Sequence, residues 1–350
     1  MWMYPTYQPA RTWEQNLEFE APATKLPIVN DWPGPISFCG LSLASPLGVV
    51  AGPLLNSDWI RYYAQLGFDW LVYKTVRSTA RSCYPLPNLV PVECEPLTEP
   101  GRTVPRRDQM LDSWAVSFGM PSQAPDVWRQ DAKVARDAIG SQQRLVVSVV
   151  GSTAGEDSDL QHLADDFARC ARWAAASGAD IVEANFSCPN VSTADGQLYQ
   201  QPQAAALVAD AIRASIGDVP LMLKIGYVDN EADCDRLVEA VGGAADALAM
   251  TNSISAYVAD QRGGMLFDGQ PRGICGAAIR SASCRQVARF RRAIDRAGAS
   301  LEIAGVGGIS SADHVRDYLN AGASVVGLAT AVMTDPLVGV RIRSDWGSQS

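Results

Sequence analysis

Nearly continuous apolar runs alternate with amphipathic stretches along the chain from residue 46 onward. Runs without polar alternation are typical of parallel strands buried on both faces, and apolar residues spaced three and four apart are typical of helices packed against them. The runs predict strands at 46–52, 68–75, 144–151, 180–182, 220–225, 245–251, 301–306 and 324–329. Helices are predicted at 58–66, 126–139, 158–177, 203–216, 231–241, 277–296 and 310–320, with Ser310 as an N-cap, and a last short one from near Pro336.

Strands that alternate with helices in this way predict a (β/α)8 barrel, the TIM barrel, of the α/β class. An open doubly wound sheet is the alternative, but the chain has no early G-x-G-x-x-G sequence to support it. In a TIM barrel the active site lies at the carboxyl ends of the strands. Polar residues that directly follow the predicted strands are therefore the candidate functional residues.

The segment before the barrel has a different composition. Residues 1–35 are rich in Pro, Trp and Tyr and lack periodicity, which predicts an extended N-terminal arm ahead of a barrel domain at 36–350. We expect Trp2, Trp13 and Trp32 to anchor the arm, either on its own domain, which we favour, or on a neighbouring subunit. Because of this aromatic arm we also expect a homodimer.

Two further segments interrupt the barrel pattern. Residues 36–44 alternate around Gly40, which predicts a short hairpin. The insertion at 77–125, after the second strand, is too long for an ordinary loop and is expected to cover a site.

The composition excludes several classes of function. The net charge is −9, the pI is about 4.8 and no basic stripe occurs, which argues against nucleic acid as a partner. No apolar run approaches the ~18 residues of a membrane span, and no leader pattern opens the chain, so we expect a cytoplasmic protein that does not use a membrane. The eight cysteines include no CxxC pair, so no metal site or disulfide framework is expected. Because His162 and His314 fall in helical patterns, the general base is not expected to be histidine.

Polar groups at the predicted strand ends suggest a ligand. Lys74 and Lys224 lie in apolar strands, where a lysine is costly to bury without a partner. An anionic or electron-rich ligand between them explains both better than core carboxylates do, because Lys224 has no acidic neighbour within its own strand. Glycines at 305, 307 and 308 lead into a helix and predict a phosphate site at its N-terminus. After the fourth strand, Cys188 lies between Asn185 and Asn190.

The sequence Asn185-Phe-Ser-Cys-Pro-Asn190 resembles the N-L-S-C-P-N signature of the dihydroorotate dehydrogenases, in particular the class 1 group that uses cysteine. Further matching stretches follow in the family's order within residues 36–338, at 45–52, 74–75, Lys224, 251–253, 273–276, 305–309 and 329–330. The pyrimidine-reducing domain of dihydropyrimidine dehydrogenase is similar too, but it usually carries His at the position of Asn190.

The resemblance implies FMN as cofactor and oxidoreduction of a CH–CH bond in dihydroorotate or a related dihydropyrimidine or cyclic amide. It implies that Cys188 moves the C5 proton as acid or base while a hydride passes between C6 and flavin N5. The substrate-binding residues that it implies are Lys74, Phe118, Gly119, Met120, Asn185, Asn190, Asn252 and Ser253. The cofactor-binding residues that it implies are Ala51, Gly52, Lys74, Thr75, Ser148, Asn185, Lys224, Thr251, Gly276, Gly307, Gly308, Ala329 and Thr330. The electron acceptor or redox partner stays open among fumarate, a quinone, oxygen, and NAD through a second subunit.

The substrate loop departs from the family pattern. It reads N-S-M-G-L-P-N in the family and Val116-Ser-Phe-Gly-Met-Pro-Ser122 here, so Val116 replaces an asparagine that binds orotate. Arg272 also replaces a family glycine. A uracil-type dihydropyrimidine or a specialised-metabolite ring is therefore an alternative substrate, and an inactive flavin-binding subunit is the alternative outside enzymes. An RNA-acting dihydrouridine synthase is disfavoured by the acidic balance.

Overall fold

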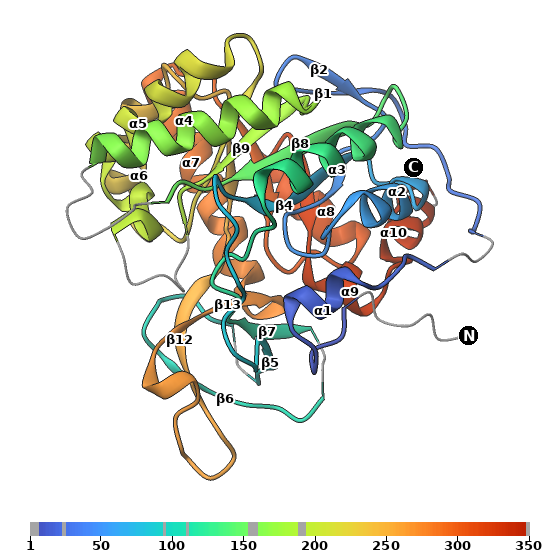
Figure 1. Cartoon of the computed structure of the whole chain (residues 1–350), viewed down its shortest axis with the longest axis vertical. Coiled ribbons are helices and arrows are strands. Elements are labelled where there is room, and N and C mark those ends of the chain that lie inside the picture. Colours follow the sequence, from blue (N-terminus) through green and yellow to red (C-terminus); the bar gives the residue numbers. More distant parts are fainter. Residues whose placement is uncertain are drawn as a thin grey trace.

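The structure is a computed structural model that describes residues 7–22, 26–93, 96–109, 112–152, 160–187 and 194–347, the side chains of 194–196 excepted. Parallel strands form a closed barrel at its centre (Figure 1). In order around the barrel these strands are β3 (Leu47–Val49), β4 (Trp70–Val76), β8 (Arg144–Val149), β9 (Ile181–Asn185), β10 (Leu221–Lys224), β11 (Ala247–Met250), β14 (Glu302–Val306) and β15 (Val325–Leu328), and β15 pairs back with β3. The predicted TIM barrel is confirmed, and each predicted strand is present.

The barrel interior is packed with apolar side chains, so it is a core and not a pore. Trp70 of β4 is fully buried there, and its Nε1 donates to the Pro46 carbonyl at 3.0 Å. The indole fits because Gly48 of β3 has no side chain: a Cβ at residue 48 would lie 2.2 Å from the Trp70 ring. Close packing of this kind fixes the strand ends and the residues that follow them.

Helices cover the outside of the barrel, largely as predicted (Figure 1). They are α2 (Ser57–Gln65), α3 (Pro125–Asp137), α4 (Leu160–Ala176), α5 (Pro202–Ile216), α6 (Glu231–Val241), α7 (Arg280–Ala297) and α8 (Ala312–Asn320), followed by α9 (Thr330–Thr334) and α10 (Val338–Gly347). The predicted cap of α8 was wrong by one residue, because Ser311, and not Ser310, accepts the His314 backbone N–H. The short last helix predicted near Pro336 is α10, which begins at Val338.

A second sheet lies at one end of the barrel, below it in Figure 1. The 77–125 insertion supplies β5 (Leu89–Pro91), β6 (Thr103–Pro105) and β7 (Ser113–Val116), and the segment after β11 supplies β12 (Ile254–Ala259) and β13 (Arg272–Gly276). Their order is β5-β7-β13-β12-β6, so that Val116 of one insertion pairs with Gly273 of the other. Two insertions far apart in the sequence therefore build one structure, which the sequence pattern did not predict.

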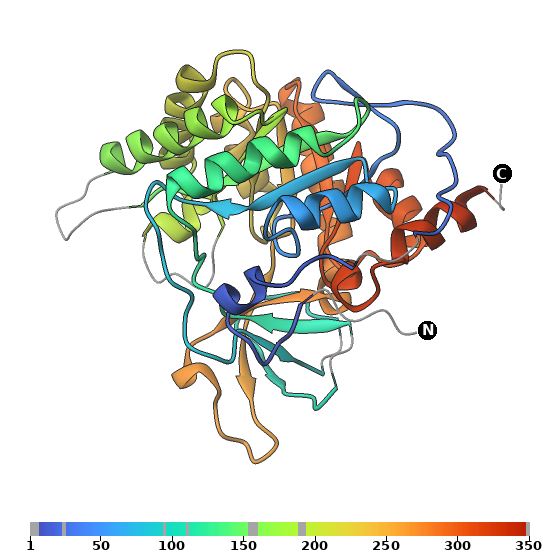
Figure 2. The ribbon, with the colours of Figure 1, turned by 45° about the vertical axis from the view of Figure 1, so that its right-hand side comes forward.

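The N-terminal segment contains a short helix, α1 (Trp13–Leu17), within the arm expected to be extended. A capping box of Thr12 and Gln15 starts it. Figure 2 shows α1, in dark blue, between the barrel and the second sheet. Trp13 and Trp32 are buried within their own chain, Trp32 against Trp346, whereas Trp2 lies outside the described residues.

The predicted hairpin at 36–44 is confirmed as β1 (Ile36–Phe38) and β2 (Leu41–Leu43). Among the described residues, no helix is long and apolar enough to span a membrane, and no cluster of potential metal ligands is found.

Candidate functional site

A cavity of about 450 Å³ lies between the carboxyl ends of the barrel strands and the second sheet. Predicted site residues from seven of the barrel strand ends, and from the segments after them, reach its wall. The predicted residues that line it are Ala51, Gly52, Lys74, Thr75, Phe118, Gly119, Met120, Asn185, Lys224, Thr251, Asn252, Ser253, Gly276, Gly307, Gly308, Ala329 and Thr330. Ser148 does not line the cavity but supports it, since its Oγ lies 2.9 Å from Thr75 Oγ1. Cys188 and Asn190 lie outside the described residues.

Lys224 has an acidic partner that the sequence analysis missed. Its Nζ lies 3.2 Å from Oε1 of Glu183, a fully buried residue of β9, and the Lys224 side chain is only 10% exposed. β9 and β10 are adjacent parallel strands, with Glu183 opposite Met222 in the register. The lower rank given to a core carboxylate as the partner of Lys224 was therefore wrong, because only its own strand was considered and the partner comes from the adjacent strand. The pair places the ammonium group toward the cavity and the carboxylate in the barrel core.

Hydrogen bonds to Ser187 hold the two asparagine side chains that line one side of the cavity. Asn185 Oδ1 accepts the Ser187 backbone N–H at 3.1 Å, and Asn252 Nδ2 donates to the Ser187 carbonyl at 2.8 Å. Thr251 Oγ1 and Ser253 Oγ are buried and have no hydrogen-bond partner among the described residues. Buried hydroxyls are normally paired, so these two fit a ligand in the cavity.

The opposite end of the cavity is shaped by glycines that permit close backbone approach. Gly307 and Gly308 have φ values of +131° and +68°, and a Cβ at residue 308 would lie 2.7 Å from the Gly276 carbonyl oxygen. Tyr318 Oη donates to the Gly307 carbonyl at 2.7 Å and holds this loop. The N-terminal ends of α7 and α8 lie next to these glycines in the chain, and helix N-termini attract anions. The arrangement fits a phosphate group.

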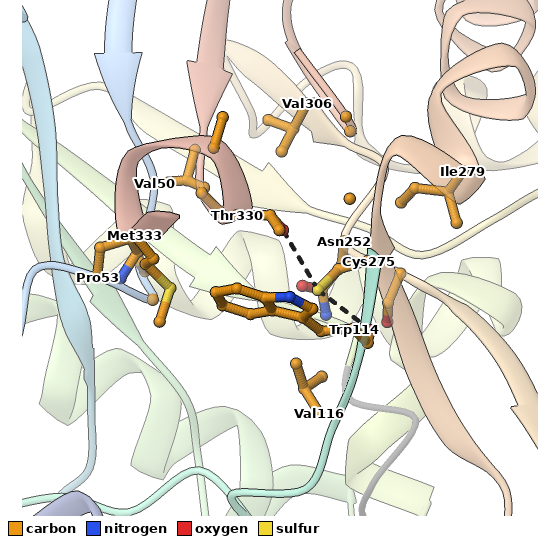
Figure 3. A pocket seen from close by; sticks show the side chains of 18 of the residues that line it. Val50, Pro53, Trp114, Val116, Asn252, Cys275, Ile279, Val306, Thr330 and Met333 are labelled. Carbon is orange, nitrogen blue, oxygen red and sulfur yellow. Dashed lines mark hydrogen bonds between the residues drawn. The ribbon is translucent and has the colours of Figure 1, made fainter. Parts of the chain in front are cut away.

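The sequence analysis did not place Trp114, Cys275, Tyr7 and Trp13 in this site, although all of them line the cavity. Trp114 and Val116 alternate on β7, so both face the cavity, and Figure 3 shows the Trp114 indole reaching into its centre. Cys275 lies opposite, with its Sγ donating to the Trp114 carbonyl at 3.4 Å and accepting from Thr330 Oγ1 at 3.5 Å (Figure 3). Tyr7 and Trp13 of the N-terminal arm complete the wall. Because alternate residues of a strand face the same side, the position of Trp114 two residues before Val116 could have predicted from the sequence that Trp114 faces the cavity.

Arg272 and the two histidines do not line the cavity. Arg272 Nε donates to Ser117 Oγ at 2.8 Å, and its guanidinium lies 5.0 Å from the Phe267 ring, so it supports the substrate loop. Burial lowers its pKa. His162 and His314 are in α4 and α8, as expected, and neither lines the cavity. Burial, with the charge of Arg280, lowers the pKa of His314.

The chain resembles known proteins over nearly its whole length. Residues 35–348 match the family model described as dihydroorotate dehydrogenase. The sequence is 35% identical to a dihydroorotate dehydrogenase of Dictyostelium discoideum, with 96% of each chain covered. The chain belongs to the dihydroorotate dehydrogenase family. It is therefore a dehydrogenase of pyrimidine metabolism, as the resemblance of the Asn185–Asn190 motif implied.

Other members of the family show how far the similarity extends. The catalytic subunit of dihydroorotate dehydrogenase B (NAD(+)) from Desulforudis audaxviator is 26% identical over 89% of this chain and 90% of its own. A dihydroorotate dehydrogenase from Eimeria tenella, solved in complex with ferulenol, superposes with a TM-score of 0.71 at 17% identity, covering 89% of this chain and 83% of that one. This structural likeness supports the barrel fold.

Proposed function

We propose that the chain is an FMN-dependent dehydrogenase that oxidises the C5–C6 bond of dihydroorotate. The observation that supports this proposal is the composition of the cavity at the strand ends. It holds two lysines, two amides and two hydroxyls without a hydrogen-bond partner among the described residues, opposite a glycine-lined end that fits a phosphate. The family as a whole uses a flavin, and the match to the family model extends over residues 35–348.

The residues present fit FMN. The glycine end, with Gly276, Gly307, Gly308, Ala329 and Thr330, would hold the ribityl phosphate, because backbone N–H groups and helix N-termini meet there. The ring would lie among Ala51, Gly52, Thr75, Asn185 and Thr251, with Ser148 supporting Thr75. Lys224 would stabilise negative charge at one ring edge, since its ammonium group faces the cavity. When bound, FMN supplies a hydride acceptor for C6 at its N5.

The substrate would bind between the amides and the 116–120 loop. Asparagine side chains offer both a donor and an acceptor, so Asn185, Asn190 and Asn252, with Ser253, suit the imide edge of a pyrimidine ring. Lys74 would contact both ring systems. Backbone N–H groups of Phe118, Gly119 and Met120 would receive the carboxylate of dihydroorotate.

Cys188 would take the C5 proton. It follows Asn185, the last residue of β9, by three positions, and active sites of TIM barrels lie just past such strand ends. A thiol with an ordinary pKa of about 8.5 is mostly protonated near neutrality. The rate of substrate oxidation should therefore rise with pH through the titration of this thiol, because the base form is the thiolate.

A second substrate class is favoured by one observation. Val116 lines the cavity, and its side chain offers no hydrogen bond to a carboxylate. A dihydropyrimidine that lacks the carboxylate, such as dihydrouracil, is therefore the second candidate.

One experiment separates these functions. The purified protein should be yellow, and its flavin should be bleached anaerobically by one member of a panel of dihydroorotate, dihydrouracil, dihydrothymine and hydantoin. Fastest bleaching by dihydroorotate supports the proposal, and fastest bleaching by dihydrouracil supports the alternative. A colourless protein that does not take up FMN would contradict the proposed cofactor and with it the enzyme mechanism.

The division into an arm at 1–35 and an FMN-binding domain at 36–350 is retained as a proposal, as are the cytoplasmic location and the lack of nucleic-acid and membrane partners. The homodimer stays a prediction; Trp13 and Trp32 are buried within their own chain, which is the favoured expectation for these anchors of the arm.

A further inference from the structure

The N-terminal arm contributes directly to the wall of the cavity. Trp13 of α1 is 4% exposed and lines the cavity together with Tyr7. Its indole Nε1 is buried and has no hydrogen-bond partner among the residues that the structure describes. A buried N–H group without an acceptor costs free energy, and an indole N–H can only donate. A ligand atom in the cavity is therefore the natural acceptor.

The arm is attached to the loop that the proposed function assigns to the substrate. The Tyr7 ring meets the Phe118 ring edge to face, with centroids 5.6 Å apart. Glu14 Oε1 accepts the Cys83 backbone N–H at 2.7 Å, and Tyr84 N donates to the Phe118 carbonyl at 3.1 Å. These contacts place α1 against the same insertion that carries Phe118, Gly119 and Met120.

The charge and polarity of this wall define what Trp13 can bind. Val116 supplies no donor, and the aromatic rings of Tyr7, Trp114 and Phe118 line the same cavity, with the Tyr7 hydroxyl also buried and without a partner among the described residues. An acceptor oxygen placed here is poorly solvated, so a hydrogen bond from Trp13 Nε1 would carry more weight than one made in water. A charged acceptor gains most from such a bond.

We propose that the arm is part of the substrate site and that Trp13 Nε1 donates a hydrogen bond to the carboxylate of the dihydroorotate-type substrate. This rests on the proposed function and adds to it a specificity-determining residue from outside the barrel. Trp13 supplies on this wall the donor that Val116 lacks. Recognition of the carboxylate is then shared between the 116–120 loop and the arm.

The chain offers a matched control for Trp13. Trp59 of α2 is 3% exposed, and its Nε1 is likewise buried without a partner among the described residues, but Trp59 does not line the cavity. Trp13→Phe and Trp59→Phe therefore remove the same group at similar burial. Only the first should affect a ligand.

The test measures dissociation constants of orotate and uracil for the FMN-loaded enzyme by calorimetry. Trp13→Phe should weaken orotate binding by about 10- to 100-fold, the range for a hydrogen bond to a charged group, and leave uracil binding within about twofold. Trp59→Phe should change neither. Trp13→His, which retains a ring N–H, should preserve part of the orotate affinity.

Two results would overturn the inference: equal orotate affinity in the two Phe variants, or equal losses for orotate and uracil in Trp13→Phe, which would indicate packing alone. If Trp13→Phe has a lowered melting temperature, the affinities for orotate and uracil are compared in Trp13→His instead. Failure of the wild-type enzyme to bind orotate, or to be bleached by dihydroorotate, would instead contradict the proposed function.

Discussion

The two walls of the cavity are built in different ways. The barrel wall carries Lys74, Asn185, Lys224 and Asn252, each at or just after the end of a parallel strand. The opposite wall carries aromatic and apolar side chains from the second sheet and the arm, among them Trp114 and Val116. The first wall is polar and rigid because close-packed strands fix it, and the second comes from insertions, which vary most readily in this fold. We infer that the barrel wall performs the chemistry and that the opposite wall selects the substrate.

The largest effect is expected from Cys188, the proposed proton-transfer group. Cys188→Ser should keep FMN but slow flavin reduction by dihydroorotate about 10²- to 10⁴-fold, because a hydroxyl is a much weaker acid than a thiol and general acid–base catalysis has this magnitude. Stopped-flow absorbance under anaerobic conditions measures the rate. Cys284→Ser, the same change on α7 away from the cavity, should have no effect. Wild-type rates in Cys188→Ser would rule out the proton-transfer role.

A large effect on stability is expected from the buried ion pair of the barrel wall. Lys224→Met leaves the Glu183 carboxylate buried without its partner, which should lower the free energy of unfolding by about 3–5 kcal/mol. Urea denaturation measures this change, and flavin fluorescence should show loss of FMN binding. The double variant Lys224→Met/Glu183→Gln should recover stability but not FMN.

Lys133→Met, on the exposed face of α3, is the control for this pair and should leave both quantities unchanged. Equal stability of the single and double variants would contradict the idea that the unpartnered Glu183 carboxylate is what destabilises Lys224→Met.

The smallest effect is expected on the opposite wall. Val116→Asn adds an amide that faces the cavity, so orotate binding relative to uracil should improve by about 10-fold, the lower end of the range for a hydrogen bond to a charged group. Titration of the holoenzyme with both ligands measures the ratio, and the rate of flavin reduction at saturating substrate should stay the same. Val134→Asn, an exposed position on α3, is the control. A change in maximal rate without a change in ratio would contradict the division of roles between the two walls.

The sequence pattern predicted the barrel wall well and the other wall poorly. Lys74, Asn185 and Lys224 were found because a strand end is a local feature, visible as a polar residue that follows an apolar run. Glu183 was missed as the partner of Lys224, although the two strands are consecutive in the barrel, because their pairing is a tertiary contact. The cap of α8 was displaced by one residue because Ser310 and Ser311 are equally good caps in sequence.

The opposite wall shows more clearly what the local sequence pattern cannot predict. The sequence identified 77–125 as an insertion over a site, but it gave no sign that β7 would pair with β13, or that α1 would pack beside Phe118. Such contacts join segments separated by many residues, and their free energy depends on loop closure and shape complementarity rather than on local propensity.

By itself, then, the sequence of this chain determined the order of strands and helices, the barrel that closes from them and the polar residues at the strand ends, because periodicity and strand-end position are encoded within a few neighbouring residues. Only the tertiary structure decided which carboxylate faces Lys224 and which aromatic residues, Trp13 and Trp114 among them, close the cavity. The reason is physical: these positions are set by packing between distant segments, which the local pattern of neither segment contains.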